Sequence, residues 1–147
     1  MQSKIYVDTN IVVDICDKAR PKFEESVALI EKFLEEGSKL YINTDTLSNL
    51  FYILGNHAKM SLEASLEKMD YINELFLLVT ITESEVKTAL SLCKNRGHTD
   101  YEDAMQYVCA KKIEADLILT NDKGFTSPDI KLRCTALKTY SSGGAVR

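Results

Sequence analysis

The chain has 147 residues, of which 45% are hydrophobic, and it carries a formal net charge of −4 with a pI near 5.2. This length suits one domain with its own hydrophobic core, so we expect a single domain over residues 1–147. The acidic balance argues against a protein that coats nucleic acid through an overall basic surface, although it leaves room for a local basic rim, and no apolar run of about eighteen residues is present to span a membrane. We also expect no signal peptide, and therefore a cytoplasmic protein.

Metal-binding and disulfide chemistry based on cysteine is also disfavoured. The four cysteines stand singly, without the C-x-x-C spacing of zinc or redox sites, and the chain has only two histidines. We expect reduced thiols in the core and no zinc site.

The first half of the chain alternates strands and helices. The strand from Ile5 to Val7 is followed by Asp8 and a short helix from Asn10 to Cys16. Apolar residues at helical spacing predict a second helix between Pro21 and Gly37, and Leu40–Ile42 is the second strand. A third helix begins with Thr44 or Asp45 as its cap and ends near Gly55.

The second half continues the alternation. A helix begins at Ser61, and the apolar run from Phe76 to Ile81 predicts a strand buried on both faces. Capping-box patterns at Thr82-x-x-Glu85 and Thr99-x-x-Glu102 predict two more helices, the second running to about Glu114. The remaining expected elements are a fourth strand over Leu117–Leu119, a short fifth strand over Arg133–Leu137, and a frayed tail over residues 141–147.

Apolar strands separated by helices predict an α/β fold. We expect a mainly parallel sheet of four to five strands with helices on both faces, because strands this apolar are not half exposed to water.

Four aspartates fall at comparable places in this pattern. Asp8 follows the first strand, Asp122 follows the fourth, and Asp100 and Asp103 lie in the first turn of a helix. In a parallel sheet these positions face the carboxyl edge, where ligands bind. A cluster of carboxylates without Arg or Lys partners repels itself unless a divalent cation neutralises it, and oxygen ligands suit Mg²⁺ or Mn²⁺.

Local roles explain the same residues equally well. Asp100 would cap the helix, Asp103 would compensate the helix dipole, and Asp122 would begin an Asn-Asp turn. The spacing alone leaves the cluster and the local roles open.

Three segments together resemble PIN-domain ribonucleases, including the VapC toxins of toxin–antitoxin pairs. They are Ile5 to Asn10, Asp100 to Gln106, and Ala115 to Phe125. The resemblance spans essentially the whole chain. It implies a parallel sheet with an acidic pocket, Mg²⁺- or Mn²⁺-dependent hydrolysis of RNA, an antitoxin protein as a partner, and a homodimer.

By these matches Asp8, Asp103 and Asp122 would be catalytic carboxylates that bind the metal. Asp100 would be an auxiliary acid, and Thr120 and Asn10 would line the pocket. Lys111, Lys112, Lys123 and Arg96 are candidates for contacts with phosphate, although each also fits a solvated surface position.

One position departs from the family pattern. Asn49 stands where the family usually has a glutamate, early in the helix after the second strand, with Asp45 four residues before it. An amide brings no negative charge, so we expect weaker metal binding. The alternative function is therefore a catalytically weakened PIN-like module that binds nucleic acid or regulates.

Two other doubly wound folds are disfavoured. A phosphoacceptor receiver would need an aspartate where Ile81 and Thr82 stand. A haloacid-dehalogenase-type phosphatase would need Asp-x-Asp where the chain has Asp8-Thr-Asn10.

Overall fold

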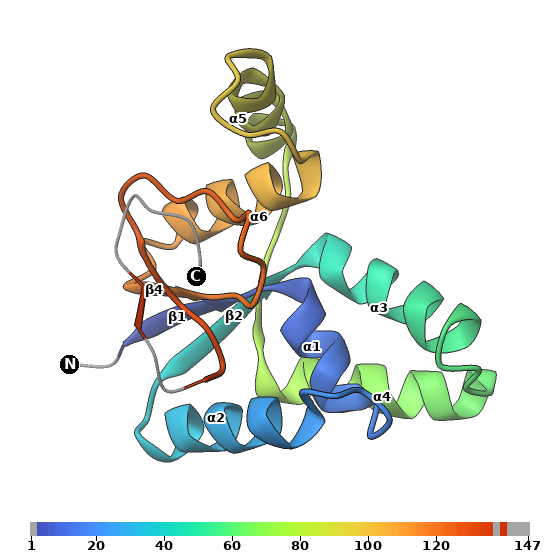
Figure 1. The fold of residues 1–147 in the computed structure, drawn as a ribbon. Helices are drawn as coiled ribbons and strands as arrows, with labels where there is room; N and C mark the ends of the chain where they lie inside the picture. The colour runs from blue at the N-terminus through green and yellow to red at the C-terminus, as the bar shows by residue number, and fades with distance from the viewer. Residues whose placement is uncertain (1–2, 137–138, 141–147) are drawn as a thin grey trace.

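The computed structural model describes residues 3–136 and 139–140. Six helices and six strands lie within these residues (Figure 1). The helices are α1 Thr9–Cys16, α2 Phe23–Glu35, α3 Thr44–Asn56, α4 Leu62–Leu75, α5 Glu83–Lys94 and α6 Tyr101–Lys112. The strands are β1 Lys4–Val7, β2 Lys39–Asn43, β3 Leu77–Val79, β4 Leu117–Leu119, β5 Lys131–Arg133 and β6 Thr139–Tyr140.

The strands form one sheet in the order β3-β2-β1-β4-β5-β6. The first five pair in parallel, and the two-residue β6 is antiparallel to β5. In the central register Ile5 of β1 aligns with Leu40 of β2 and with Leu117 of β4. The predicted α/β fold with a mainly parallel sheet is confirmed, with β6 as an addition to the expected four to five strands.

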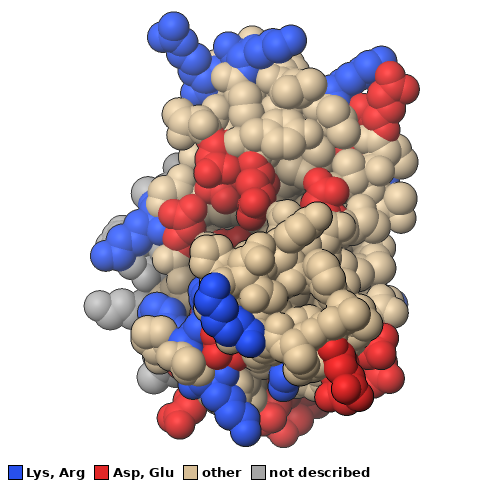
Figure 2. All heavy atoms as spheres, turned by 90° about the vertical axis from the view of Figure 1, so that its right-hand side faces the viewer, with Lys and Arg blue, Asp and Glu red and all other residues tan. Residues whose placement is uncertain are grey.

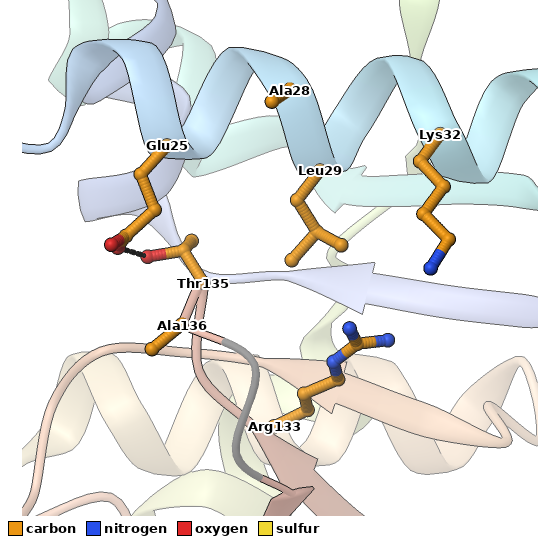
Figure 3. Close-up of a pocket in the computed structure, with 7 residues that line it drawn as sticks. All are labelled: Glu25, Ala28, Leu29, Lys32, Arg133, Thr135 and Ala136. Atoms are coloured by element: carbon orange, nitrogen blue, oxygen red, sulfur yellow. Dashed lines mark hydrogen bonds between the residues drawn. The ribbon is translucent and has the colours of Figure 1, made fainter.

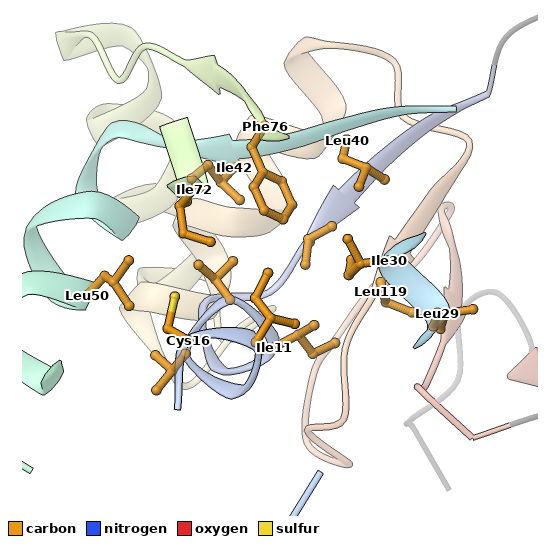
Figure 4. Close-up of a cluster of buried hydrophobic side chains, with 14 of the residues drawn as sticks. Ile11, Cys16, Leu29, Ile30, Leu40, Ile42, Leu50, Ile72, Phe76 and Leu119 are labelled. Carbon is orange, nitrogen blue, oxygen red and sulfur yellow. The ribbon is translucent and has the colours of Figure 1, made fainter. Parts of the chain in front are cut away.

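Helices cover both faces of the sheet, as the sequence predicted. Helices α1 to α4 lie on one side, and α5 and α6 form a hairpin on the other (Figure 1). The alternation within β1 supplies both cores, because Ile5 and Val7 point to the first side and Tyr6 points to the second. The larger core packs α1, α2 and the ends of α3 and α4 against the sheet, with side chains such as Ile11, Leu50 and Ile72 almost fully buried (Figure 4).

Several predicted boundaries and caps hold. Ser61 caps α4 by accepting a hydrogen bond from the backbone of Ala64. At the start of α5, the Glu85 carboxylate accepts the backbone N–H of Thr82 at 2.8 Å, which is the predicted capping box. Cys16 and Cys109 are buried free thiols, as expected.

The strand predicted over Phe76–Ile81 is shorter and less buried than expected. Only Leu77–Val79 pair with β2, at the edge of the sheet, and the side chains of Leu77 and Leu78 are 47% and 39% exposed. At the two ends of these exposed residues, Phe76, the C-terminal cap of α4, packs into the main core and Val79 packs into the second core. The continuous run of apolar residues therefore did not correctly predict that this strand is buried on both faces.

Other differences concern the ends of elements. Asn43, rather than Thr44 or Asp45, caps α3 by accepting the Thr46 N–H at 3.0 Å. Helix α2 begins at Phe23, two residues after Pro21, and α6 ends at Lys112. The fifth strand lies at Lys131–Arg133, earlier than predicted, and residue 137 and the predicted tail over 141–147 lie outside the described residues.

No helix within the described part of the chain is long and apolar enough to cross a membrane.

Candidate active site

The ends of β1 and β4 and the first turn of α6 meet at the carboxyl edge of the sheet. Asp8 directly follows β1, Asp122 comes shortly after β4, and Asp103 lies near the start of α6. Asp103 shares a side-chain hydrogen bond with Asp122, the charges of Asp8 and Asp122 act on Asp103, and the charge of Asp122 acts on Asp8. The structure thus brings together the three acids selected from the sequence. Figure 2 looks onto this edge and shows acidic side chains gathered around a hollow.

The carboxylate of Asp8 is held in a fixed position by two donors. Asp8 is 3% exposed; its Oδ1 accepts from Gln106 Nε2 at 2.9 Å and its Oδ2 accepts from Thr120 Oγ1 at 2.7 Å. The Thr120 hydroxyl also accepts the backbone N–H of Asp122 at 3.1 Å, and Gln106 Oε1 accepts the Thr9 N–H at 3.0 Å. Thr120 therefore links Asp8 to the loop that carries Asp122, and Gln106 links it to α1 and α6.

The carboxylates at this edge raise the pKa values of their neighbours. Burial, then the hydrogen bond with Asp122 and the charges of Asp8, Asp100 and Asp122, raise the pKa of Asp103 to about 8. Burial also raises the pKa of Asp8, against the hydrogen bonds from Thr120 and Gln106. No Lys or Arg within the described residues forms an ion pair with Asp8, Asp103 or Asp122. A bound cation would therefore relieve the repulsion.

Asp100 and Asp122 have the local roles that the sequence suggested, and they also belong to the cluster of carboxylates. Asp100 caps α6, because its Oδ1 accepts the Asp103 N–H at 3.1 Å, and Asp122 Oδ1 accepts the Gly124 N–H at 2.8 Å in a turn. The predicted capping box of Thr99 and Glu102 is wrong, since the helix begins one residue later. Asp100 remains exposed at the rim of the acidic group.

A cleft of about 160 Å³ lies beside the acids, between α3 and α6. Asn49 and Asp45 of α3 line it opposite Glu102 of α6, and Asn49 Nδ2 lies 3.5 Å from Glu102 Oε2. Glu102 as a whole is exposed, but partial burial of its carboxyl group and then the charges of Asp8, Asp100 and Asp45 raise its pKa. Asn49 therefore faces this cleft.

Asn10 lies on the other side of Asp8. It is exposed at the start of α1, and its backbone donates a hydrogen bond to the Asp8 carboxylate. Its side chain lines a second cleft, which it shares with Asp122. All seven residues selected from the sequence thus lie at this edge of the sheet.

Two of the four candidate phosphate contacts are already engaged. Lys111 forms an ion pair with Asp129, and Lys112 donates to Glu85 Oε1 at 2.9 Å and to the Thr80 carbonyl at 2.8 Å. Arg96 and Lys123 are exposed at the surface.

The carboxylate oxygens at this edge suit a hard divalent cation that is bound partly by the protein and partly by phosphate groups of a substrate. Within the described residues, no three His, Cys, Asp or Glu side chains are already arranged to hold one ion. Mg²⁺ is commonly bound by one or two carboxylates, with water and substrate phosphates completing its shell. The paired carboxylates of Asp103 and Asp122, with Asp8 beside them, fit that description.

Sequence reasoning missed two residues of the site, Gln106 and Glu102. Gln106 lies three residues after Asp103, so helical spacing on one face was a signal for it. Glu102 was assigned to a capping box, and only the true start of α6 shows that its side chain is available to the cleft.

A larger cavity, of about 510 Å³, lies away from these carboxylates, between α2 and β5 (Figure 3). At one end the Thr135 hydroxyl donates to Glu25, and the backbone of Thr135 donates to Asn121 Oδ1 at 2.9 Å. These contacts tie α2 to the residue before Asp122. The residues that line this cavity therefore support the loop that carries Asp122, but the acids of the site do not line it.

Comparison with known proteins agrees with this geometry. The PIN-domain profile matches residues 5–131. Ribonuclease VapC1 of Aquifex aeolicus (strain VF5) is 33% identical over 133 residues, which is 90% of each chain.

Solved structures share the fold. VapBC from Salmonella typhimurium, solved bound to DNA, superposes with a TM-score of 0.68 at 16% identity, over 92% of this chain and 100% of that one. Mycobacterium tuberculosis VapC20, described as a toxin that cleaves the sarcin-ricin loop, gives 0.64 at 10% identity, over 78% and 86%. The profile and the sequence relative both cover most of the chain, which therefore belongs to the PIN-domain family of VapC-like ribonucleases.

Proposed function

We propose that this protein is an endoribonuclease that requires Mg²⁺ or Mn²⁺ and hydrolyses phosphodiester bonds of RNA. The observation that carries the proposal is that Asp8, Asp103 and Asp122 gather at one edge, where no Lys or Arg of residues 3–136 forms an ion pair with them. The 33% identical relative from Aquifex aeolicus, which is named a ribonuclease, supports the choice of RNA.

Asp8, Asp103 and Asp122 would hold the ion, which when bound would activate water and stabilise charge on the phosphate. Thr120 and Gln106 are positioning residues, because their hydrogen bonds fix both oxygens of the Asp8 carboxylate. A fixed carboxylate loses little freedom when its ligand binds.

The other acids and amides would act around this centre. Asp100 holds the first turn of α6, so that Asp103 stays directed toward Asp122. Glu102 and Asp45 would supply negative charge to the cleft in which Asn49 stands. Asn10 would contribute a neutral donor or acceptor beside Asp122.

The test is cleavage of a labelled single-stranded RNA with Mg²⁺, with Mn²⁺ and with excess EDTA. We expect cleavage only with a divalent ion, and its loss in Asp8→Asn, which removes a ligand charge. Asp70→Asn, an exposed change on α4, is the matched control and should retain activity. Full cleavage in EDTA, or by folded Asp8→Asn protein, would refute the mechanism.

We also propose that the chain binds an antitoxin protein and forms a homodimer. Several solved relatives are described as VapBC proteins, which supports the first proposal. Tyr52 of α3 and Leu62 of α4 are 66% and 64% exposed on adjacent helices, which supports an apolar contact between copies. Light scattering should then give twice 16.6 kDa, and a mass of 16.6 kDa would refute the dimer.

A weakened module that binds RNA without cleaving it is the second candidate. Asn49 favours it, because the cleft there lacks the charge that a glutamate would bring. Negligible cleavage by the unmodified protein, with RNA binding retained, would support this candidate.

A further inference from the structure

A second cleft opens at the carboxyl edge, on the side of Asp122 away from Asn49. It has a volume of about 400 Å³ and lies between α1, the turn before α2 and the loop after β4. It is lined by Asn121 and Asp122 of the loop after β4, by Asn10 at the start of α1, and by Arg20 and Lys22 of the turn before α2. The cleft thus joins the acidic centre to two cations.

Arg20 is held in place by a buried acid. Its Nε donates to Asp14 Oδ1 at 2.6 Å, and the hydroxyl of Ser26 lies 3.4 Å from the other oxygen of Asp14. Asp14 is 5% exposed and Ser26 is fully buried, whereas the side chain of Arg20 is 34% exposed. The backbone of Arg20 is fixed as well, because its N–H bonds to the Asp17 carbonyl.

This anchoring uses only part of the guanidinium. An arginine has five N–H donors in a planar fork. Only the Nε donor of Arg20 has a hydrogen-bond partner within the described residues. The terminal nitrogens therefore remain available to an anion with paired oxygens, for which the fork of arginine is suited.

Electrostatics favour such an anion here. The acidic centre repels a polyanion, so an RNA strand that reaches Asp122 needs positive charge next to it. Lys22 adds a second cation, which pairs with Glu25 only at 3.6 Å and with both side chains largely exposed.

We propose that Arg20 binds a phosphate of the RNA strand next to the one that is cleaved, with Asp14 and Ser26 as positioning residues. This inference rests on the proposed ribonuclease function. In this proposal the RNA strand passes through the 400 Å³ cleft next to the acidic centre.

The test is binding of a short fluorescein-labelled single-stranded RNA, followed by anisotropy with Ca²⁺ in place of Mg²⁺, and with a gel to show that the RNA stays intact. Loss of one charge-assisted contact should weaken binding of Arg20→Ala about 10-fold. The slope of log K against log salt should become shallower by about 0.7, as for one phosphate on a single strand. In cleavage assays KM should rise more than kcat falls.

Lys18→Ala is the matched control, because Lys18 is an exposed cation of the same turn that does not line the cleft. It should change affinity far less than Arg20→Ala. Arg20→Lys should be intermediate, since it keeps the charge but loses the fork.

Arg20→Ala leaves the buried Asp14 unpaired and so destabilises the fold. The double variant Asp14→Asn/Arg20→Gln leaves no unpaired charge and should show the same loss of RNA affinity. If both Arg20 variants bind RNA as tightly as Lys18→Ala does, the inference is wrong while the ribonuclease proposal stands. If the unmodified protein binds no RNA, both are wrong.

Discussion

Replacing Asn49 by glutamate tests how the acidic cleft works. In the structure Asn49 Nδ2 lies 3.5 Å from Glu102 Oε2, a contact between an amide donor and a carboxylate. Asn49→Glu replaces that donor with a second carboxylate. The change therefore has opposite expected effects on the metal-free and the metal-bound protein.

Without metal, the new charge faces Glu102 at about the same distance. Two unit charges about 3.5 Å apart repel by about 1 kcal/mol in water and about 5 kcal/mol at an effective dielectric constant of about 20. Glu102 is exposed and Asn49 half-buried, so the lower part of this range applies. We expect a loss of about 1 kcal/mol in unfolding free energy, or roughly 2–4 °C in Tm for a chain of this size.

With metal, the added carboxylate should tighten binding. Changes around a metal site alter affinity by roughly 10- to 100-fold, and we expect a gain within that range. Calorimetric titration with Mn²⁺ measures it, and melting curves in EDTA and in Mn²⁺ measure the change in stability. Asn49→Gln is the control, because it adds the same methylene without charge and should shift neither quantity by much.

The results also separate the two candidate functions. High cleavage by the unmodified protein, little changed by Asn49→Glu, means that Glu102 and the aspartates suffice. Negligible cleavage that the glutamate rescues favours a binding module. If Asn49→Glu changes neither metal affinity nor cleavage and only destabilises the fold, our placement of Asn49 in the site is wrong.

Three further changes test the physical account of the fold and site. The pKa of Asp103 is about 8 in the folded state and about 4 when unfolded, so the unfolding free energy in EDTA should fall as the pH rises between these values. Melting curves should show a smaller fall for Asp103→Asn. Equal falls in both proteins would contradict the raised pKa of Asp103. Conversely, the pKa of Glu85 is lowered to about 2, chiefly by the Thr82 backbone and then by Lys112, so Glu85→Gln, which removes the charge, should lower Tm at pH 7 far more than at pH 2. Equal Tm values at pH 7 would show that the charge of Glu85 does not stabilise the fold. Leu50 is fully buried, and Leu50→Ala should cost roughly 2–5 kcal/mol in denaturant unfolding, whereas Leu90→Ala, at an exposed position, should cost little.

Much of the site could be predicted from the sequence because its acids occupy the ends of strands. Asp8 and Asp122 each follow a short apolar strand, and in a parallel sheet such positions meet at one edge whatever the lengths of the helices between them. Local hydrogen-bond chemistry was also sufficient for the capping box of Thr82 and Glu85. The capping box depends only on residues three apart, and the shared edge of the acids follows from the parallel direction of the strands.

The tertiary structure decided what depends on strand order and on contacts between distant residues. The apolar residues of β3 predicted a strand buried on both faces. In the structure β3 is the edge strand next to β2, and Leu77 and Leu78 are exposed. Gln106 reaches Asp8 across 98 positions in the sequence. Arg20 acquires its orientation only because α1 and α2 pack so that Asp14 is buried beneath it. Sequence periodicity shows which face of an element is apolar, whereas the neighbours of that face are set by the packing of the whole chain.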